Sequence, residues 1–115
     1  GGLMQIGAFT TTGQFCPEYF SHIIFDNQAH DSTGGQPTCS DTVDFGKVAE
    51  ACNYRSIQVV NDLDSLSKSI NNLKEKKGPL MLIINVKKGA RKNLGRPSLL
   101  PKEHKERFMK YLKEN

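Results

Sequence analysis

The chain has 115 residues, the size of one domain, and 37% of them are hydrophobic while 24% are charged. This composition argues against a disordered, collagen-like or coiled-coil protein, and no apolar run approaches the roughly 20 residues that span a bilayer. All 16 lysines and arginines lie in residues 47–115, whereas the five charged residues before position 47 are all acidic. Three widely spaced cysteines without a CxxC pair argue against a disulfide framework and favour a reducing cytoplasm.

The first half of the chain predicts one helix, one strand and one long loop. Apolar residues at helical spacing favour a helix over 3–12 that stops at Gly13, and Gly7 within it indicates close packing against a neighbour or a ligand. The apolar run at 20–26 predicts a strand, and its lack of alternation predicts burial on both faces, as in parallel sheets. Residues 27–42 form a long polar loop, and loops of that length in compact domains are usually functional or disordered.

The second half alternates helices with short apolar strands. Wholly apolar strands between helices predict an α/β fold with a parallel sheet. In such sheets ligands bind outside the carboxyl ends of the strands, and the long polar loop leaves from one such end. Helices are expected over 45–53 with Asp44 as N-cap, over 63–76 with Asn61 or Asp62 as N-cap, and from Pro101 onward, with strands over 55–60 and 80–86.

The polar loop offers hard oxygen donors, which Mg²⁺ prefers, in Asp26, Asn27 and the residues that follow. Gly34 and Gly35 would let backbone N–H groups approach a ligand closely. A solvated, turn-rich connection explains this composition equally well. A third alternative is a zinc site formed by Cys16, His22, His30 and Cys39. This site is disfavoured because the spacing of these residues matches no standard zinc-binding pattern.

The runs HIIFDNQAHDSTGGQPT, VDFGKVAEACNYR and KKGARKNLGRP resemble the thiamine-diphosphate-dependent 2-oxo acid decarboxylases that act on phosphonopyruvate or sulfopyruvate. The resemblance covers nearly the whole chain. It implies a three-layer α/β fold with a mainly parallel sheet flanked by helices, in which residues 1–115 form the C-terminal portion of the diphosphate-binding domain. It also implies conversion of phosphonopyruvate to phosphonoacetaldehyde and CO2, with a sulfopyruvate decarboxylase subunit as the alternative.

The resemblance also implies a cofactor site in the polar loop. Asn27 would give its side-chain oxygen to Mg²⁺, and Ala29 would give its backbone carbonyl. His30 and Asp31 are candidates for a catalytic role, although an Asp31 that only hydrogen-bonds the loop is an equal alternative. Gln36 is a candidate substrate contact. The implied contacts to thiamine diphosphate are Asn27, Ala29, His30, Asp31, Ser32, Thr33 and Gly34.

The family's cofactor motif begins with Gly-Asp-Gly, and this part would precede Gly1. We therefore expect the chain to be the downstream part of a longer enzyme or a naturally short subunit, inactive by itself. Its expected partners are an upstream pyrimidine-binding domain or a separate subunit, in a homo-oligomer that acts on a small 2-oxo acid. A non-catalytic association domain of the same fold is the alternative from another class.

The basic segment 87–97 follows the last predicted strand. Given the resemblance, Arg91 or Arg96 would attract the anionic group of the substrate, because arginine suits bidentate anion binding. A solvated surface explains the segment equally well, and nucleic acid is disfavoured because no aromatic residue interleaves the cations. In the last helix, Phe108 and its apolar neighbours are expected to pack on the core.

Overall fold

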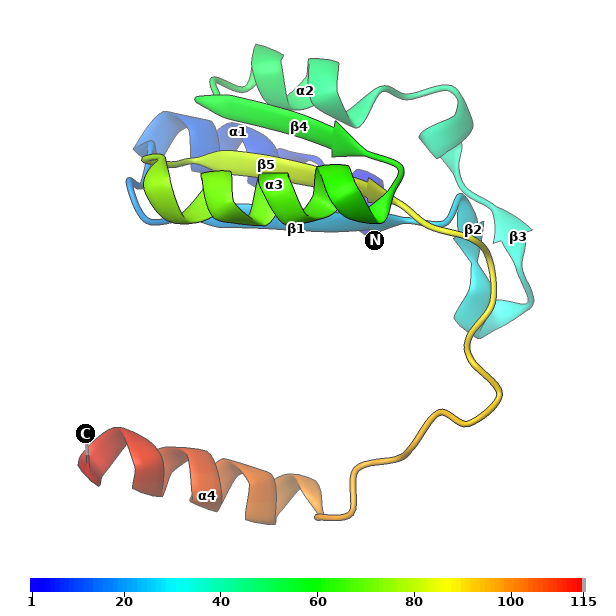
Figure 1. Ribbon diagram of the computed structural model, residues 1–115, viewed down its shortest axis with the longest axis vertical. Helices are drawn as coiled ribbons and strands as arrows, with labels where there is room; N and C mark the ends of the chain where they lie inside the picture. The colour runs from blue at the N-terminus through cyan, green and yellow to red at the C-terminus, as the bar shows by residue number, and fades with distance from the viewer. Residues whose placement is uncertain (115) are drawn as a thin grey trace.

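A three-stranded parallel sheet lies at the centre of the computed structural model, which describes residues 1–114 (Figure 1). Its strands are β1 (Ser21–Asp26), β4 (Ser56–Val60) and β5 (Leu80–Asn85), in the order β1-β5-β4. The predicted α/β class with a parallel sheet is confirmed. Both outer strands begin opposite Leu80, so their carboxyl ends meet at one edge of the sheet.

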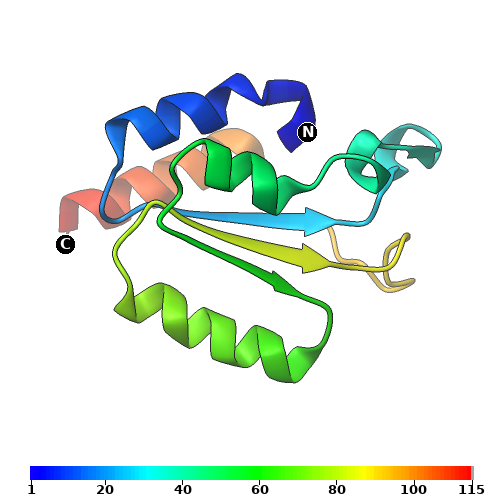
Figure 2. The same cartoon turned by 90° about the horizontal axis from the view of Figure 1, so that it is seen from above.

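Helices cover the two faces of the sheet, which gives a three-layer arrangement (Figure 2). On one face, α1 (Gly7–Phe15) and α2 (Phe45–Ala51) enclose the larger core. On the other face, α3 (Leu63–Glu75) packs Leu66 and Leu73 over a smaller one. The buried residues of the larger core are Phe9, Phe45, Ala49, Tyr54, Met81 and Ile83, and those of the smaller core are Val60, Leu82 and Ile84.

The two apolar strands differ in burial. β5 is central, and its first five residues are buried, as expected for a strand covered on both faces. The same expectation was wrong for β1, where exposed and half-buried residues alternate. Ile23 is 45% exposed and Phe25 is 69% exposed because α3 covers the sheet over β4 and β5 but leaves β1 bare on that face.

The first helix differs from the prediction in where it begins, where it ends and which glycine packs closely against a neighbour. A 3₁₀ turn (Gly2–Gln5) precedes α1, and α1 continues through Gly13 to Phe15. Close packing of Gly7 against a neighbouring element is absent, since a Cβ there would meet no described atom beyond its own helix within 4 Å. Gly13 makes that contact instead, against the backbone of Cys52.

The N-caps of α2 and α3 form as the sequence predicts. Asp44 Oδ1 accepts a hydrogen bond from Lys47 N at 3.1 Å, and Asp62 Oδ1 accepts one from Ser65 N at 2.8 Å. Of the two candidates for the second cap, Asp62 is therefore the residue used. The apolar face of α3 is only partly buried, because Leu63 and Ile70 are exposed.

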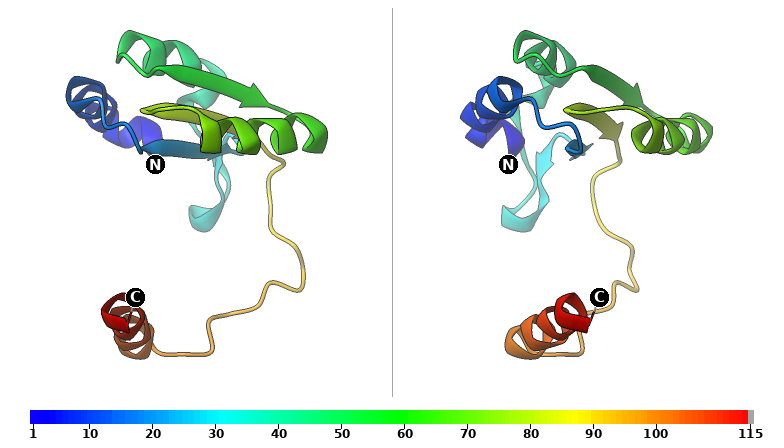
Figure 3. Two further views of the ribbon diagram at one scale, coloured as in Figure 1. Left: turned by 60° about the vertical axis from the view of Figure 1, so that its left-hand side comes forward. Right: turned by 90° about the vertical axis from the view of Figure 1, so that its left-hand side faces the viewer.

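The last helix, α4 (Pro101–Glu114), forms where Pro101 predicts it but does not pack as expected. An extended segment, residues 86–100, carries it away from the sheet (Figures 1 and 3). No described residue of α4 is buried, and Phe108, Met109 and Leu112 are 61%, 43% and 54% exposed. The prediction that this helix packs on the core is therefore wrong. Within residues 1–114, no helix is both long and apolar enough to cross a membrane.

Candidate functional site

The polar loop after β1 has more internal structure than its composition suggests. Ala29–His30 (β2) pairs antiparallel with Gln36–Pro37 (β3), and 3₁₀ turns occupy Asp31–Thr33 and Cys39–Asp41. Gly34 and Gly35 have φ angles of 113° and 78°, values that favour glycine, and they close the small hairpin. The segment is therefore an ordered unit at the carboxyl end of β1.

Asp26 fastens this unit to the sheet. Its Oδ1 accepts one hydrogen bond from Gln28 N at 2.9 Å and another from Ser40 Oγ at 2.8 Å. The first bond shapes the turn out of the strand, where Gln28 has a φ of 55°. The second joins the start of the loop to its far end, fourteen residues away. Asp26 thus holds the two ends of the loop together.

Asn27 lies at the centre of a second set of hydrogen bonds. Its Oδ1 accepts from Ala29 N at 3.1 Å, and its Nδ2 donates to Asp31 Oδ2 at 2.7 Å. Ala29 is buried and stands opposite Pro37. The bonds across the hairpin are made by its neighbours, since Thr38 N donates to Gln28 O and Gly35 N donates to His30 O, so the Ala29 carbonyl points away from β3. Both predicted metal donors, the amide oxygen of Asn27 and the carbonyl of Ala29, therefore come from one short turn.

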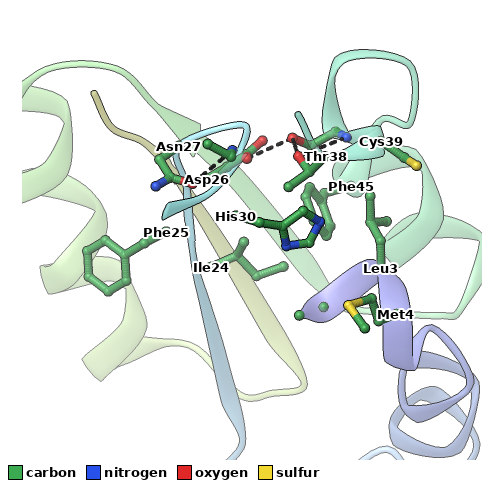
Figure 4. A pocket seen from close by; sticks show the side chains of 14 residues that line it. Leu3, Met4, Ile24, Phe25, Asp26, Asn27, His30, Thr38, Cys39 and Phe45 are labelled. Atoms are coloured by element: carbon green, nitrogen blue, oxygen red, sulfur yellow. Dashed lines mark hydrogen bonds between the residues drawn. The ribbon is translucent and has the colours of Figure 1, made fainter. Parts of the chain in front are cut away.

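A pocket of about 290 Å³ opens between this turn, the beginning of the chain and the start of α2 (Figure 4). Figure 4 shows His30 directed into it, near Ile24 and Phe45, while the Phe25 ring points away. Asn27, Ala29 and His30 all line it, so the structure brings these three predicted residues together. The complete lining is Gly1, Gly2, Leu3, Met4, Ile24, Phe25, Asp26, Asn27, Ala29, His30, Thr38, Cys39, Ser40 and Phe45.

Four of the predicted cofactor contacts do not line the pocket, namely Asp31, Ser32, Thr33 and Gly34. They belong to the 3₁₀ turn of the hairpin and to the glycine that follows it. Gln36, the candidate substrate contact, is engaged inside the same hairpin: its Nε2 donates to Thr33 O at 2.8 Å, and its Oε1 accepts from Thr33 Oγ1 at 3.2 Å. As the structure stands, these residues shape the hairpin beside the pocket.

A hydrogen bond joins the basic segment to the loop. Gly89 N donates to Asp31 Oδ2 at 2.9 Å. Arg91 and Arg96 are exposed in the segment between β5 and α4, and neither lines the pocket. Their candidate role in substrate binding stays a prediction.

Sequence reasoning missed the contribution of the first residues of the chain and of the far end of the loop. Gly1 and Gly2 lie at the start of the first 3₁₀ turn, and Thr38 and Ser40 come from the end of the loop. One signal was available, because a Gly-Gly pair before a helix is typical of a backbone that approaches a ligand closely. No local pattern marks Thr38 or Ser40, since only the tertiary bond to Asp26 brings that part of the loop back.

The donors around the pocket fit Mg²⁺ with a diphosphate better than they fit zinc. Among residues 1–114, no three His, Cys, Asp or Glu side chains gather into a metal-binding cluster, so the zinc alternative does not form. An amide oxygen and a backbone carbonyl are hard donors of the kind Mg²⁺ takes together with phosphate oxygens. The glycines at the start of the chain leave room for backbone N–H groups to face an anion.

Fold and pocket together define a class: a three-layer α/β domain with a pocket of mixed polar and apolar lining at the carboxyl end of a parallel strand. Comparison with known proteins is more specific. The chain is 37% identical over 110 residues to phosphonopyruvate decarboxylase from Streptomyces viridochromogenes, and 37% identical over 112 residues to that from Streptomyces hygroscopicus. It is 32% identical over 112 residues to sulfopyruvate decarboxylase subunit beta from Methanococcus maripaludis.

These matches cover the chain almost completely but the relatives only in part. They take in 96% and 97% of this chain, yet 28% of the length of each phosphonopyruvate decarboxylase and 60% of the subunit beta. No protein-family model matches the chain. The resemblance inferred from the sequence is confirmed: the chain is a homologue of one segment of these decarboxylases.

Proposed function

We propose that the chain is the diphosphate- and Mg²⁺-binding part of a thiamine-diphosphate-dependent 2-oxo acid decarboxylase. One observation carries this proposal: Asn27, Ala29 and His30, marked by the family resemblance, line one pocket together with Gly1 and Gly2. Asn27 Oδ1 and the Ala29 carbonyl would hold Mg²⁺. The glycine backbone would face the diphosphate, whose negative charge the metal offsets.

The proposed reaction converts phosphonopyruvate to phosphonoacetaldehyde and CO2. The bond between the carboxylate and the carbonyl carbon breaks, its electron pair stays on that carbon, and a proton later replaces the CO2. When bound, thiamine diphosphate supplies the electron sink that this step requires. His30 points into the pocket and is the side chain of this chain best placed to hold or donate a proton there.

Substrate choice between phosphonopyruvate and sulfopyruvate is the finer part of the proposal. Both are 2-oxo acids with a second anionic group, which suits the basic segment after β5. Phosphonopyruvate is favoured because the matches named for it have 37% identity, against 32% for the sulfopyruvate subunit. The sulfopyruvate decarboxylase subunit stays the alternative, and the two differ in which substrate the complete protein consumes.

We also propose that this part works with a pyrimidine-binding domain or a separate subunit, in an oligomer, in the cytoplasm. The partial coverage of the phosphonopyruvate decarboxylases favours a further domain, and the match to a subunit beta favours a second chain. The bare apolar side chains of Ile23 and Phe25 on β1 offer a surface for such a partner. An association domain without activity would share this surface but would not need Asn27.

Titration of thiamine diphosphate into the complete protein, with and without Mg²⁺, tests the proposal. Asn27→Ala removes one proposed metal ligand and should weaken Mg²⁺-dependent cofactor binding about tenfold or more. Asn71→Ala, an exposed asparagine on α3, is the matched control and should bind as the wild type does. Equal affinity in Asn27→Ala and the wild type contradicts the proposed metal site. Turnover of phosphonopyruvate compared with sulfopyruvate then decides the substrate.

A further inference from the structure

Asp31 joins two segments that are far apart in the sequence. A single oxygen, Oδ2, accepts from Asn27 Nδ2 at 2.7 Å and from Gly89 N at 2.9 Å. The first partner lies in the turn that lines the pocket, and the second lies in the basic segment, fifty-eight residues away. Asp31 itself does not line the pocket. Its carboxylate is therefore placed to organise neighbours and not to touch a ligand in the pocket.

The bond to Asn27 decides which end of that amide is the oxygen. An ionised carboxylate only accepts hydrogen bonds, so the NH2 group of Asn27 must face Asp31. The amide oxygen is then directed to the opposite side, where it lies 3.1 Å from Ala29 N. Without the acceptor on Asp31, only the 3.1 Å bond from Ala29 N would oppose a turn of the amide that presents its NH2 group, which does not bind a cation.

The bond to Gly89 fixes the start of the basic segment. Gly89 has a φ of 93°, which favours glycine, and a charge-assisted bond to its N–H holds the chain just after β5. Lys87 and Lys88 precede this anchor, and Arg91 follows two residues later. The same carboxylate that contacts Asn27 therefore holds the backbone between Lys88 and Arg91 against the loop.

We propose that Asp31 is a positioning residue that couples the metal-binding turn to the basic segment 87–97. It aims the Asn27 oxygen at the divalent cation and keeps the cations where an anionic 2-oxo acid would approach. This inference rests on the proposed function for its ligands. The coupling of the two segments rests only on the contacts of Asp31.

The test compares Asp31→Ala and Asp31→Asn with the control Asp41→Ala in the complete protein. Asp41 is an acid of the same loop that receives no side-chain hydrogen bond from the described residues. The first readout needs no cofactor: amide hydrogen exchange at Gly89 and tryptic cleavage within 87–96. Both should rise about tenfold in Asp31→Ala and stay unchanged in Asp41→Ala. Asp31→Asn keeps an acceptor oxygen and should fall between the wild type and Asp31→Ala.

The second readout is the Mg²⁺ concentration that gives half-maximal thiamine diphosphate binding. It should rise about tenfold in Asp31→Ala, be partly rescued in Asp31→Asn and stay unchanged in Asp41→Ala, with equal thermal midpoints. Unchanged exchange and cleavage in Asp31→Ala overturn the coupling. Changed exchange with an unchanged Mg²⁺ requirement overturns the role toward Asn27. A wild type that binds no thiamine diphosphate overturns the proposed function instead, and the exchange arm still decides the coupling.

Discussion

Gly13 lies directly against the carbonyl oxygen of Cys52, and this contact sets how closely α1 approaches the end of α2. A Cβ at position 13 would overlap with that oxygen and crowd the carbonyl carbon behind it. The contact matters for the pocket because its walls include the residues just before α1 and Phe45 at the start of α2. A shift of either helix would therefore change the width of the pocket.

Replacement of Gly13 by alanine should destabilise the fold by several kcal/mol or prevent folding, since backbone atoms must move to admit the methyl group. Gly7→Ala is the matched control, because open space surrounds a Cβ there. It should be neutral or stabilise by up to about 1 kcal/mol, the helix preference of alanine over glycine. Urea unfolding of both variants measures the difference. Equal stability of the two variants would show that α1 and α2 do not touch at this point.

Two phenylalanines should respond very differently to truncation. Phe9 is 1% exposed within the larger core, so Phe9→Ala should cost about 3–5 kcal/mol of unfolding free energy. Phe108 is 61% exposed on α4, so Phe108→Ala should stay within about 0.5 kcal/mol of the wild type. Thermal or urea unfolding of this chain provides both values. A large loss in Phe108→Ala would mean that α4 packs on the sheet in solution.

Stability should decline in mild acid because of His22. Its ring packs near Phe9 and Phe20, and burial lowers the pKa of His22 from the usual 6.5. The unfolded chain therefore binds a proton at a higher pH than the folded chain does. Stability is fully present above about pH 6.5 and is lost progressively as the pH falls toward the lowered folded-state pKa.

His22→Phe should remove this part of the pH dependence while keeping an aromatic ring in place. The variant also loses the 3.2 Å contact between His22 Nδ1 and the Tyr54 hydroxyl, so its stability near pH 8 should be lower by about 1 kcal/mol. Urea midpoints measured between pH 5 and 8 give both slopes. Parallel slopes in wild type and variant would assign the acid sensitivity to other groups.

The bare face of β1 should promote self-association of this chain. Ile23 is 45% exposed on this face, and β1 is an outer strand of the sheet. Apolar outer strands associate readily with other chains. Ile23→Lys should weaken self-association about tenfold in sedimentation experiments without lowering the thermal midpoint. Tyr19→Lys, a change at a 95% exposed position before β1, is the control and should associate as the wild type does. The reverse ranking would place the associating surface outside β1.

Much of the fold could be predicted from local patterns. The carboxylates of Asp44 and Asp62 reach only as far as the next turn, so their capping roles can be read from neighbouring residues. The apolar run of β5 and the sequence signature of the polar loop are local as well. Burial of β1 could not be predicted, because an apolar strand looks alike whether or not a helix covers it. The same limit applies to α4, whose amphipathic pattern does not say what its apolar face meets.

The sequence by itself determined the main helices and strands and the α/β class, because periodicity and capping act over short distances. The family resemblance marked the loop residues Asn27, Ala29 and His30, whose roles stay predictions. Only the tertiary structure decided that Gly1 and Gly2 face this loop, and that Asp31 contacts Gly89. Those contacts join segments whose separation along the chain carries no local signal. They exist because parallel strands bring their carboxyl ends to one edge of the sheet, where the pocket forms.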